Sequence, residues 1–338
     1  MNDILKYLRE LIAIDSPTGF FHKTDEYIIS ELKKLGFSPK TQVKGGVVAE
    51  LGGSGNALCI AAHADTIGLM VRRINPNGTV VVTNLGGLHP FYCLDANVRV
   101  YSRGGKVYTG VMRRANPSVH LMSEEERGAE LDFEKNLFLV LDEVTSSKKE
   151  TEALGICCGD CVAVEPNYIE TPSGFIKSRF LDDKASCAVL LALAKKVSEG
   201  RVKLNRRVCL MFTEYEEIGH GGAKIPEDIY DFLAVDIGCV GVNHYSDERK
   251  VTIGVKDAAF PYHTDLVNEM VDKAKAKGID YVLDMMLPRY GSDANVALRA
   301  GYDVRHGLIG PGVLETHGYE RTHKDALKAT YELIESLV

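Results

Sequence analysis

Acidic and imidazole side chains gather in five short segments, each at a point where a strand or a helix is expected to begin or end. The segments are residues 62–65, 181–184, 212–219, 234–238 and 316–323. In open α/β sheets, ligands bind beyond the carboxyl ends of the strands. We therefore take these segments as the candidates for a functional site.

The first segment, Ala62-His63-Ala64-Asp65, follows the apolar run 57–62, which predicts a strand buried on both faces. On an extended backbone, positions i and i+2 face the same way. Asp65 is thus placed to orient one ring nitrogen of His63 while the other binds a metal. The alternative is a surface histidine beside a capping aspartate.

The second segment places Asp182 and Asp183 at the start of an Ala-rich helix predicted over 184–198. Paired aspartates at a helix start are often caps that favour the helix dipole. The alternative is a carboxylate that bridges two metal ions.

The next two segments follow apolar strands. Three glutamates, Glu214, Glu216 and Glu217, come just after the strand predicted near 207–213, where they repel one another unless cations neutralise them. Adjacent residues on a non-helical backbone point in different directions, so one glutamate can bind metal while its neighbour takes a proton from water. Asp236 ends an apolar strand, and a buried carboxylate is costly without a partner or a metal.

The last segment offers two histidines. His323 is expected to open the final helix, over 323–337, with its ring pointing back to the sheet edge, and His317 is the competing candidate. Together, two imidazoles and three carboxylates suit Zn²⁺, Co²⁺ or Mn²⁺ rather than an iron–sulfur cluster. Two such cations sharing a carboxylate lie roughly 3.5–4 Å apart and hold a water between them. The predicted ligands are His63, Asp182, Glu217, Asp236 and His323.

The elements that must position these residues show two kinds of sequence pattern. Predicted helices (3–14, 22–35, 184–198, 263–277, 292–300, 323–337) alternate with apolar strands on both sides of a central stretch. That stretch, 67–165, has short β-branched runs between glycine-rich turns, which is typical of a small β-barrel-like domain. We expect an α/β domain over 1–66 and 166–338, interrupted by a β domain over 67–165.

Composition and net charge argue against some classes of binding partner and of cellular location. The 338 residues carry a net charge of −7, which argues against a nucleic-acid or anionic-membrane binder. No apolar run reaches the roughly 18–20 residues that span a bilayer. The start of the chain lacks the order of a secretory signal, and most of the eight cysteines lie among apolar residues, so we expect a cytoplasmic protein.

Taken together, the segments resemble the tetrahedral, or glutamyl, aminopeptidases, metallopeptidase family forty-two. The resemblance is carried by His63-Ala64-Asp65-Thr66-Ile67-Gly68, by 178–184, by Glu216-Glu217-Ile218-Gly219 and by Val235-Asp236, and it extends to 117–122 and 155–160. It implies a mixed-sheet α/β/α catalytic domain with an inserted β domain that builds subunit contacts. It also implies dimers that assemble into a twelve-subunit shell.

The resemblance implies roles for the residues. His63 and Asp236 would hold one metal, Glu217 and His323 the other, and Asp182 would bridge them. Glu216 would be the general base, Asp65 would orient His63, and the bond between Asp182 and Asp183 would be cis. Three features depart from the family pattern: Thr66 replaces an acidic residue, His220-Gly221 replaces a Leu-Arg type pair, and His323 lacks a following serine, so His317 stays as the alternative ligand.

The implied activity is removal of N-terminal residues from short peptides, through water held by two divalent metal ions. Two alternatives stay open: a dinuclear deacylase or carboxypeptidase, and a catalytically inactive scaffold of the same fold. The preferred N-terminal residue is not set by the sequence, although Arg321 and Lys324 near His323 could favour acidic ones.

Overall fold

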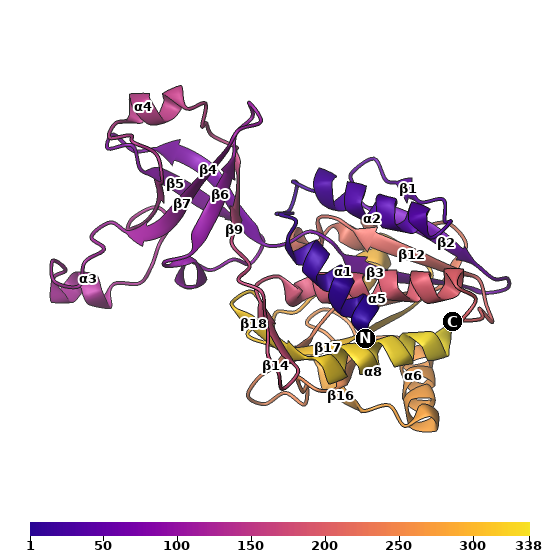
Figure 1. The fold of residues 1–338 in the computed structure, drawn as a ribbon. Coiled ribbons are helices and arrows are strands. Elements are labelled where there is room, and N and C mark those ends of the chain that lie inside the picture. The colour runs from indigo at the N-terminus through magenta and orange to yellow at the C-terminus, as the bar shows by residue number, and fades with distance from the viewer. The chain divides into compact units, whose positions relative to one another are not determined.

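The structure is a computed structural model that describes all 338 residues, and these form two compact units. The larger unit comprises Met1–Thr66 and Pro166–Val338, and the smaller comprises Ile67–Glu165 (Figure 1). The chain thus enters the larger unit, leaves it for about a hundred residues and returns. Each unit is described by itself below.

A mixed sheet of twelve strands forms the middle of the larger unit. Its main path runs in the order β1 (Lys40–Thr41), β2 (Val47–Gly52), β12 (Val208–Thr213), β3 (Ala57–His63), β13 (Ile229–Val235), β17 (Arg305–Leu314), β18 (Glu320–His323), β11 (Phe175–Ser178) and β10 (Ile169–Glu170). Three further strands join at β17: β14 (Gly238–Val240), β15 (Val251–Lys256) and, through β15, β16 (Tyr281–Met285).

The central strands of this sheet run parallel. Strands β12 and β13 both pair with β3 in parallel, and β13 pairs with β17 in the same sense. All residues of β3 and β12 are buried, because both strands are apolar on both faces. Their carboxyl ends therefore lie at one edge of the sheet, with His63 directly beside Thr213.

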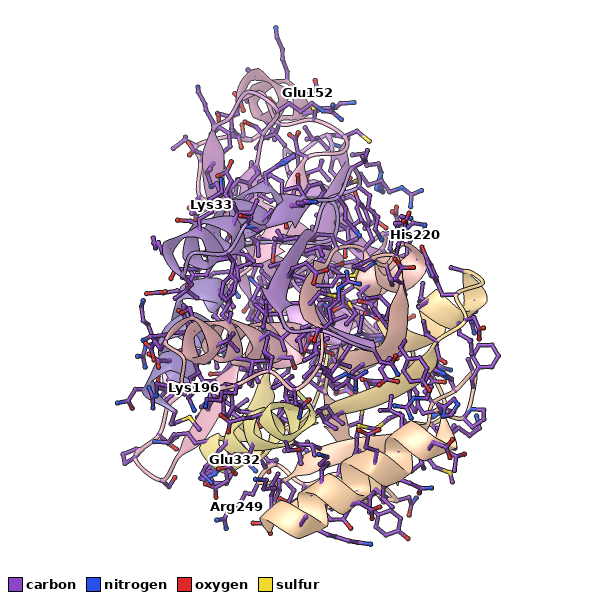
Figure 2. The ribbon with its side chains drawn as sticks, turned by 90° about the vertical axis from the view of Figure 1, so that its right-hand side faces the viewer. Lys33, Glu152, Lys196, His220, Arg249 and Glu332 are labelled. Atoms are coloured by element: carbon purple, nitrogen blue, oxygen red, sulfur yellow. The ribbon has the colours of Figure 1, made fainter.

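Six helices belong to this unit: α1 (Asn2–Ile12), α2 (His22–Lys34), α5 (Leu181–Ser198), α6 (Thr264–Lys277), α7 (Asp293–Arg299) and α8 (Lys324–Leu337). Every residue of α5 from Leu181 to Ala194 is buried, because the helix is mostly apolar beyond its first turn and lies between β3, α1 and α8. Helix α7 packs on β13 and β17. Lysines such as Lys33 and Lys196 lie on the outer sides of their helices (Figure 2).

The smaller unit is a closed barrel of six antiparallel strands. Their order is β4 (Gly68–Ile74), β5 (Val80–Leu85), β8 (Leu137–Leu141), β7 (Val107–Arg114), β6 (Asn97–Tyr101) and β9 (Cys161–Val164). Side chains alternate in and out along β6, β7 and β8, so that Val98, Val100 and Met112 are buried while their neighbours are more exposed. Two short helices, α3 (Glu124–Gly128) and α4 (Lys148–Ala153), complete this unit.

The large mixed sheet and the closed barrel confirm the predicted fold class, an α/β domain with an inserted small β-barrel domain. No helix in the structure combines the length and the apolar character that crossing a membrane requires.

Candidate active site

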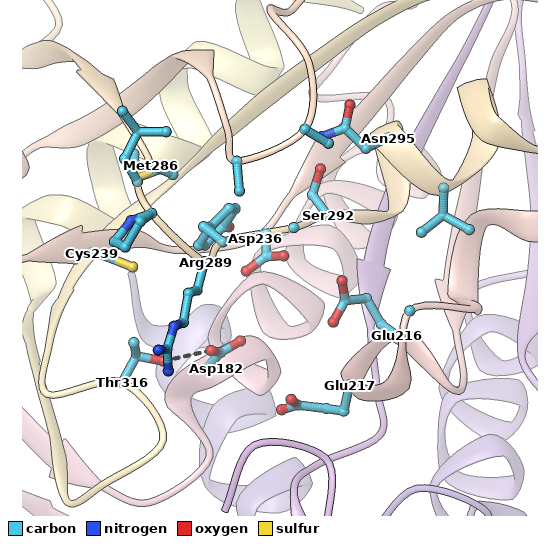
Figure 3. A pocket seen from close by; sticks show the side chains of 18 of the residues that line it. Asp182, Glu216, Glu217, Asp236, Cys239, Met286, Arg289, Ser292, Asn295 and Thr316 are labelled. Atoms are coloured by element: carbon cyan, nitrogen blue, oxygen red, sulfur yellow. Dashed lines mark hydrogen bonds between the residues drawn. The ribbon is translucent and has the colours of Figure 1, made fainter.

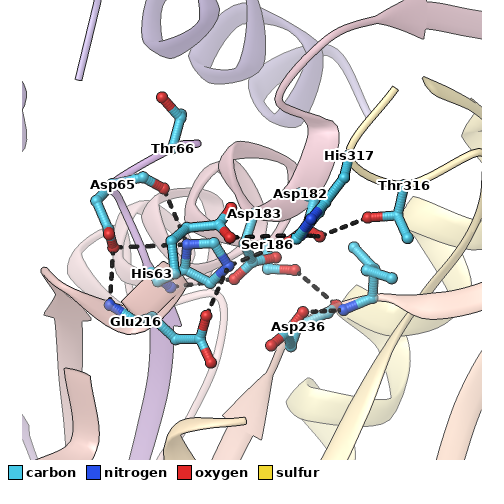
Figure 4. Close-up of polar contacts among 12 residues, drawn as sticks. His63, Asp65, Thr66, Asp182, Asp183, Ser186, Glu216, Asp236, Thr316 and His317 are labelled. Atoms are coloured by element: carbon cyan, nitrogen blue, oxygen red, sulfur yellow. Dashed lines mark hydrogen bonds and ion pairs between the residues drawn. The ribbon is translucent and has the colours of Figure 1, made fainter. Parts of the chain in front are cut away.

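Three parallel strands deliver the first set of candidate residues to one edge of the sheet (Figure 4). Strand β3 ends at His63, and β13 ends one residue before Asp236. Strand β12 ends at Thr213, and a short 3₁₀ turn that begins at Glu216 follows it. The strand order alone therefore brings together groups that are far apart in the chain.

Asp182 reaches this edge from the start of α5, where its backbone is not helical (φ −76°, ψ 103°) and its bond to Asp183 is cis. The buried carboxylate of Glu320 holds it there, because Oε2 accepts the main-chain N–H of Asp182 at 3.1 Å. The other oxygen of Glu320 accepts the N–H of His317, also at 3.1 Å. Sequence reasoning missed Glu320, whose only signal was an acidic residue in the same segment as His317.

The side chains converge around Asp182. Its Oδ1 lies 3.0 Å from Nε2 of His63, and its Oδ2 lies 3.7 Å from Nε2 of His317. Nε2 of His317 is 3.3 Å from Oε2 of Glu217, and Nε2 of His63 is 3.8 Å from Oε2 of Glu216. Two groups of potential metal ligands have all their ligand atoms within 4.8 Å of one another: His63 with Glu216 and Asp236, and His63 with Asp182 and Glu217.

His323 is not part of this cluster, which corrects the prediction that it is a ligand. It caps α8, where its Nδ1 accepts the N–H of Asp325 at 3.1 Å, and its Nε2 lies 2.9 Å from the carbonyl oxygen of Ser173. Its ring also packs edge-on against Phe175. Both nitrogens are therefore engaged elsewhere, and His317, in the turn between β17 and β18, takes the expected place.

Asp65 orients His63, but through its main chain rather than its carboxylate. Nδ1 of His63 lies 2.9 Å from the carbonyl oxygen of Asp65 and 3.7 Å from its Oδ1. An Nδ1–H that donates to this carbonyl leaves Nε2 as the nitrogen facing the cluster, as a metal ligand requires. The Asp65 carboxylate instead accepts the N–H of Glu216 at 3.1 Å and the hydroxyl of Thr18 at 2.7 Å.

Closely spaced buried carboxylates determine the electrostatics of the site. Burial, together with neighbouring carboxylates, raises the pKa of Glu216 and of Glu217 well above the usual range. Burial and the charge of Asp182 raise the pKa of Asp236 to about 7. Asp182 is the exception: burial acts to raise its pKa, but the hydrogen bond from His63 and the nearby charges of His63 and His317 lower it overall. Four carboxylates, those of Asp182, Glu216, Glu217 and Asp236, thus crowd around two imidazoles, those of His63 and His317.

The cluster forms the floor of a pocket of about 690 Å³ (Figure 3). Its wall includes one face of α7 and the loop before it, with Met286, Leu287, Arg289, Ser292, Asn295, Val296 and Arg299. Arg321, which the sequence suggested as a selector of acidic substrates, is instead bound through two nitrogens by Glu248, at 2.7 and 2.9 Å. The arginines that line the pocket are Arg289 and Arg299.

Comparisons with known proteins identify the family of this chain. The family model of the M42 glutamyl aminopeptidases matches residues 45–333, a range that includes the whole cluster. A Bacillus subtilis protein named "Putative aminopeptidase YhfE" is 39% identical over 333 residues, covering 98% of this chain and 95% of its own.

Solved structures share the fold. An aminopeptidase from Desulfurococcus kamchatkensis superposes with a TM-score of 0.87 at 24% identity, covering all of this chain and 94% of its own. The TET1 peptidase of Pyrococcus horikoshii, described as assembling into a tetrahedron or a large octahedral shell, gives 0.85 at 21% identity and covers 99% of this chain and 98% of its own. Because the family model spans most of the sequence, the chain belongs to the M42 glutamyl aminopeptidases, a family of metal-dependent peptidases, and is a peptide hydrolase.

Proposed function

We propose that the protein removes N-terminal residues from short peptides and works with two divalent metal ions, Zn²⁺, Co²⁺ or Mn²⁺. His63 and Asp236 would hold one ion, Glu217 and His317 the other, and Asp182 would contact both. The observation that carries this proposal is the position of Asp182, whose two oxygens each face a different imidazole, His63 at 3.0 Å and His317 at 3.7 Å.

The residues fit such ions for two further reasons. Oε1 of Glu217 is buried and has no hydrogen-bond partner in the protein, an arrangement that is costly unless something else binds it. The donors are all imidazole nitrogens and carboxylate oxygens, which suit divalent ions of borderline hardness. When bound, such ions polarise a carbonyl group and lower the pKa of water.

Glu216 is the proposed general base. Its carboxylate lines the pocket and lies 3.8 Å from Nε2 of His63, and its main-chain N–H is held by Asp65. Burial raises its proton affinity, so it can accept a proton from water at the scissile carbonyl and pass that proton to the leaving amine. Asp65 therefore positions both the base, through its carboxylate, and His63, through its carbonyl.

The pocket supports a substrate bound by its first residue. The acidic floor attracts the free amino group of a peptide, and the wall offers apolar contacts from Met286, Leu287 and Val296. Arg289 and Arg299 stand in the same wall, and the guanidinium of Arg299 lies over the ring of Phe260 rather than beside a carboxylate. This supports an acidic N-terminal side chain as the preferred one.

We also propose that the protein is a cytoplasmic homo-oligomer built from dimers, up to a dodecamer. The proposal is supported by the fold it shares with the TET1 peptidase, whose assemblies are shells. Light scattering measures the mass directly, and a monomer contradicts this part of the proposal.

The function is tested with reporter substrates that carry a free or an acetylated amino group. We expect cleavage of free-amine substrates only, faster for Glu than for Leu or Lys. Cleavage of the acetylated set indicates a deacylase instead, and a protein that binds no metal and cleaves neither set is an inactive scaffold. Glu216→Gln should keep its metal content and lose at least about 100-fold in kcat. Near-normal turnover in that variant refutes the role of Glu216.

A further inference from the structure

We propose that Asp293, the first residue of α7, is a positioning residue that fixes the loop carrying Glu216 and Glu217. The inference rests on the proposed function, because it assumes that these two glutamates act in the reaction. Asp293 is 3% exposed and is not among the residues that line the pocket. Its effect on catalysis must therefore be indirect.

The loop needs an external hold, because its backbone is irregular. Between the end of β12 and the turn at Gly221, Tyr215 and Gly219 both adopt left-handed conformations (φ 68° and 75°). Such a segment lacks the repeating hydrogen bonds of a helix or strand, so side chains from elsewhere must determine where Glu216 points. One of these is Asp65, which accepts the N–H of Glu216.

Asp293 joins the two ends of the loop with one carboxylate. Its Oδ2 accepts the hydroxyl of Thr213, the last residue of β12, and its Oδ1 accepts the N–H of Gly222 at 2.6 Å. Lys44 strengthens the outer end, since its Nζ donates to the carbonyl oxygens of His220 and Gly221, each at 2.6 Å. The loop is thereby closed across its base.

The packing leaves no space between α7 and the loop. A Cβ atom on Gly221 would lie 2.2 Å from Oδ1 of Asp293, and one on Gly222 would lie 2.2 Å from the main-chain oxygen of Asp293. Only glycine at both positions permits this approach, which supports a dedicated contact rather than an incidental one.

The same helix also faces the substrate pocket. Asn295, Val296 and Arg299 line the pocket wall, and neither amide atom of the buried Asn295 has a hydrogen-bond partner in the protein. Helix α7 thus touches the space for the substrate with one face and the glutamate loop with its first residue. Loosening the Asp293 contact should shift Glu216 relative to a bound substrate without removing any group that binds it.

The experiment compares Asp293→Asn and Thr213→Val with Asp231→Asn as the matched control. Asp231 is equally buried and is paired with Arg206 and Arg305, but it lies near the start of β13, five residues before Asp236. For Asp293→Asn we expect kcat to fall about 10- to 100-fold, because a displacement of about 1 Å can cost that much. With metal in excess, KM should stay close to normal, while the affinity for metal should fall because the same loop carries Glu217. Asp231→Asn should lose stability but keep its kcat and its metal affinity.

Two results overturn the proposal: a kcat of Asp293→Asn within about twofold of normal, or equal losses of kcat in Asp293→Asn and Asp231→Asn. If Asp293→Asn does not fold, the nearly isosteric Thr213→Val tests the proposal instead, because it removes one of the two contacts of the Asp293 carboxylate. An unchanged kcat in Thr213→Val then overturns the proposal. Failure of the proposed function is distinguishable, because it appears as an active Glu216→Gln variant or an inactive wild-type protein.

Discussion

Glu320 gives the sharpest test of how the site is assembled, because one carboxylate accepts the main-chain N–H groups of two proposed ligands. Each of its oxygens lies 3.1 Å from one donor, the N–H of Asp182 or of His317. Replacing Glu320 by Gln keeps the shape but leaves only one acceptor. Whichever way the amide points, one of the two N–H groups faces an NH₂ group.

The magnitude follows from this geometry. A buried N–H left without an acceptor costs about 1–3 kcal/mol. Burial and the charge of Asp182 raise the pKa of Glu320, so a neutral amide also relieves some repulsion. We therefore expect Glu320→Gln to lose about 1 kcal/mol in the free energy of unfolding, the lower end of that range. The affinity for metal should fall about 10- to 100-fold, because the residue orients two ligands.

Urea unfolding at pH 7 and metal titration check these two numbers. The control is Glu248→Gln, which removes a partly exposed ion pair with Arg321 and should cost no more than about 1 kcal/mol, with no effect on metal affinity. A Glu320→Gln variant with normal stability and normal metal affinity would refute the reasoning, as would a Glu248→Gln variant that loses metal equally.

Two further predictions concern the ligands themselves. His317→Ala should lose bound metal on dialysis while His323→Ala retains it, because the ring of His323 contacts Ser173 and not the cluster. Elemental analysis measures the metal bound per chain. The reverse result restores His323 as the ligand. The metal-free protein should become less stable as the pH rises from about 4 to about 7. The pKa of Asp236 is raised from 3.8 to about 7, and those of Glu216 and Glu217 are raised as well. Over that range the folded state therefore binds more protons than the unfolded state, and its free energy of unfolding falls as protons are lost. Thermal unfolding in a chelator at several pH values measures this loss of stability, and added metal should abolish it. A metal-free protein that gains stability over the same pH range contradicts the prediction.

The sequence predicted the parts of the site that depend on strand ends. The strands ending at His63 and Thr213 are apolar throughout because they are buried on both faces, and that pattern is visible without a structure. Parallel pairing then places the polar residues that follow these strands at a common edge. For this reason the structure brings His63, Glu216 and Asp236, which the sequence singled out, within 4.8 Å of one another.

The local sequence pattern could not determine whether His317 or His323 faces the cluster. The choice depends on β18, a strand of four residues whose pairing with β11 sets His323 opposite Phe175. Such a strand is too short to show alternation, and the sequence instead suggested that the final helix begins at His323. The helix begins one residue later, and His323 is its cap. Which histidine faces the cluster was therefore decided by tertiary pairing.

The structure also separates two kinds of buried acid in this site by what they accept. Glu320, Asp65 and Asp293 each accept at least one main-chain N–H, so fixed dipoles compensate their charge, and none of them is a proposed ligand. Glu217 accepts no main-chain N–H, and its Oε1 has no partner at all. A carboxylate such as that of Glu320 is compensated by the backbone and serves to hold the chain in place. Glu217 lacks such donors and is destabilising until a cation binds, so it gains most from a proposed metal ion, whereas Asp236 has part of its charge compensated already, because its Oδ1 accepts the N–H of Ile237 at 2.7 Å.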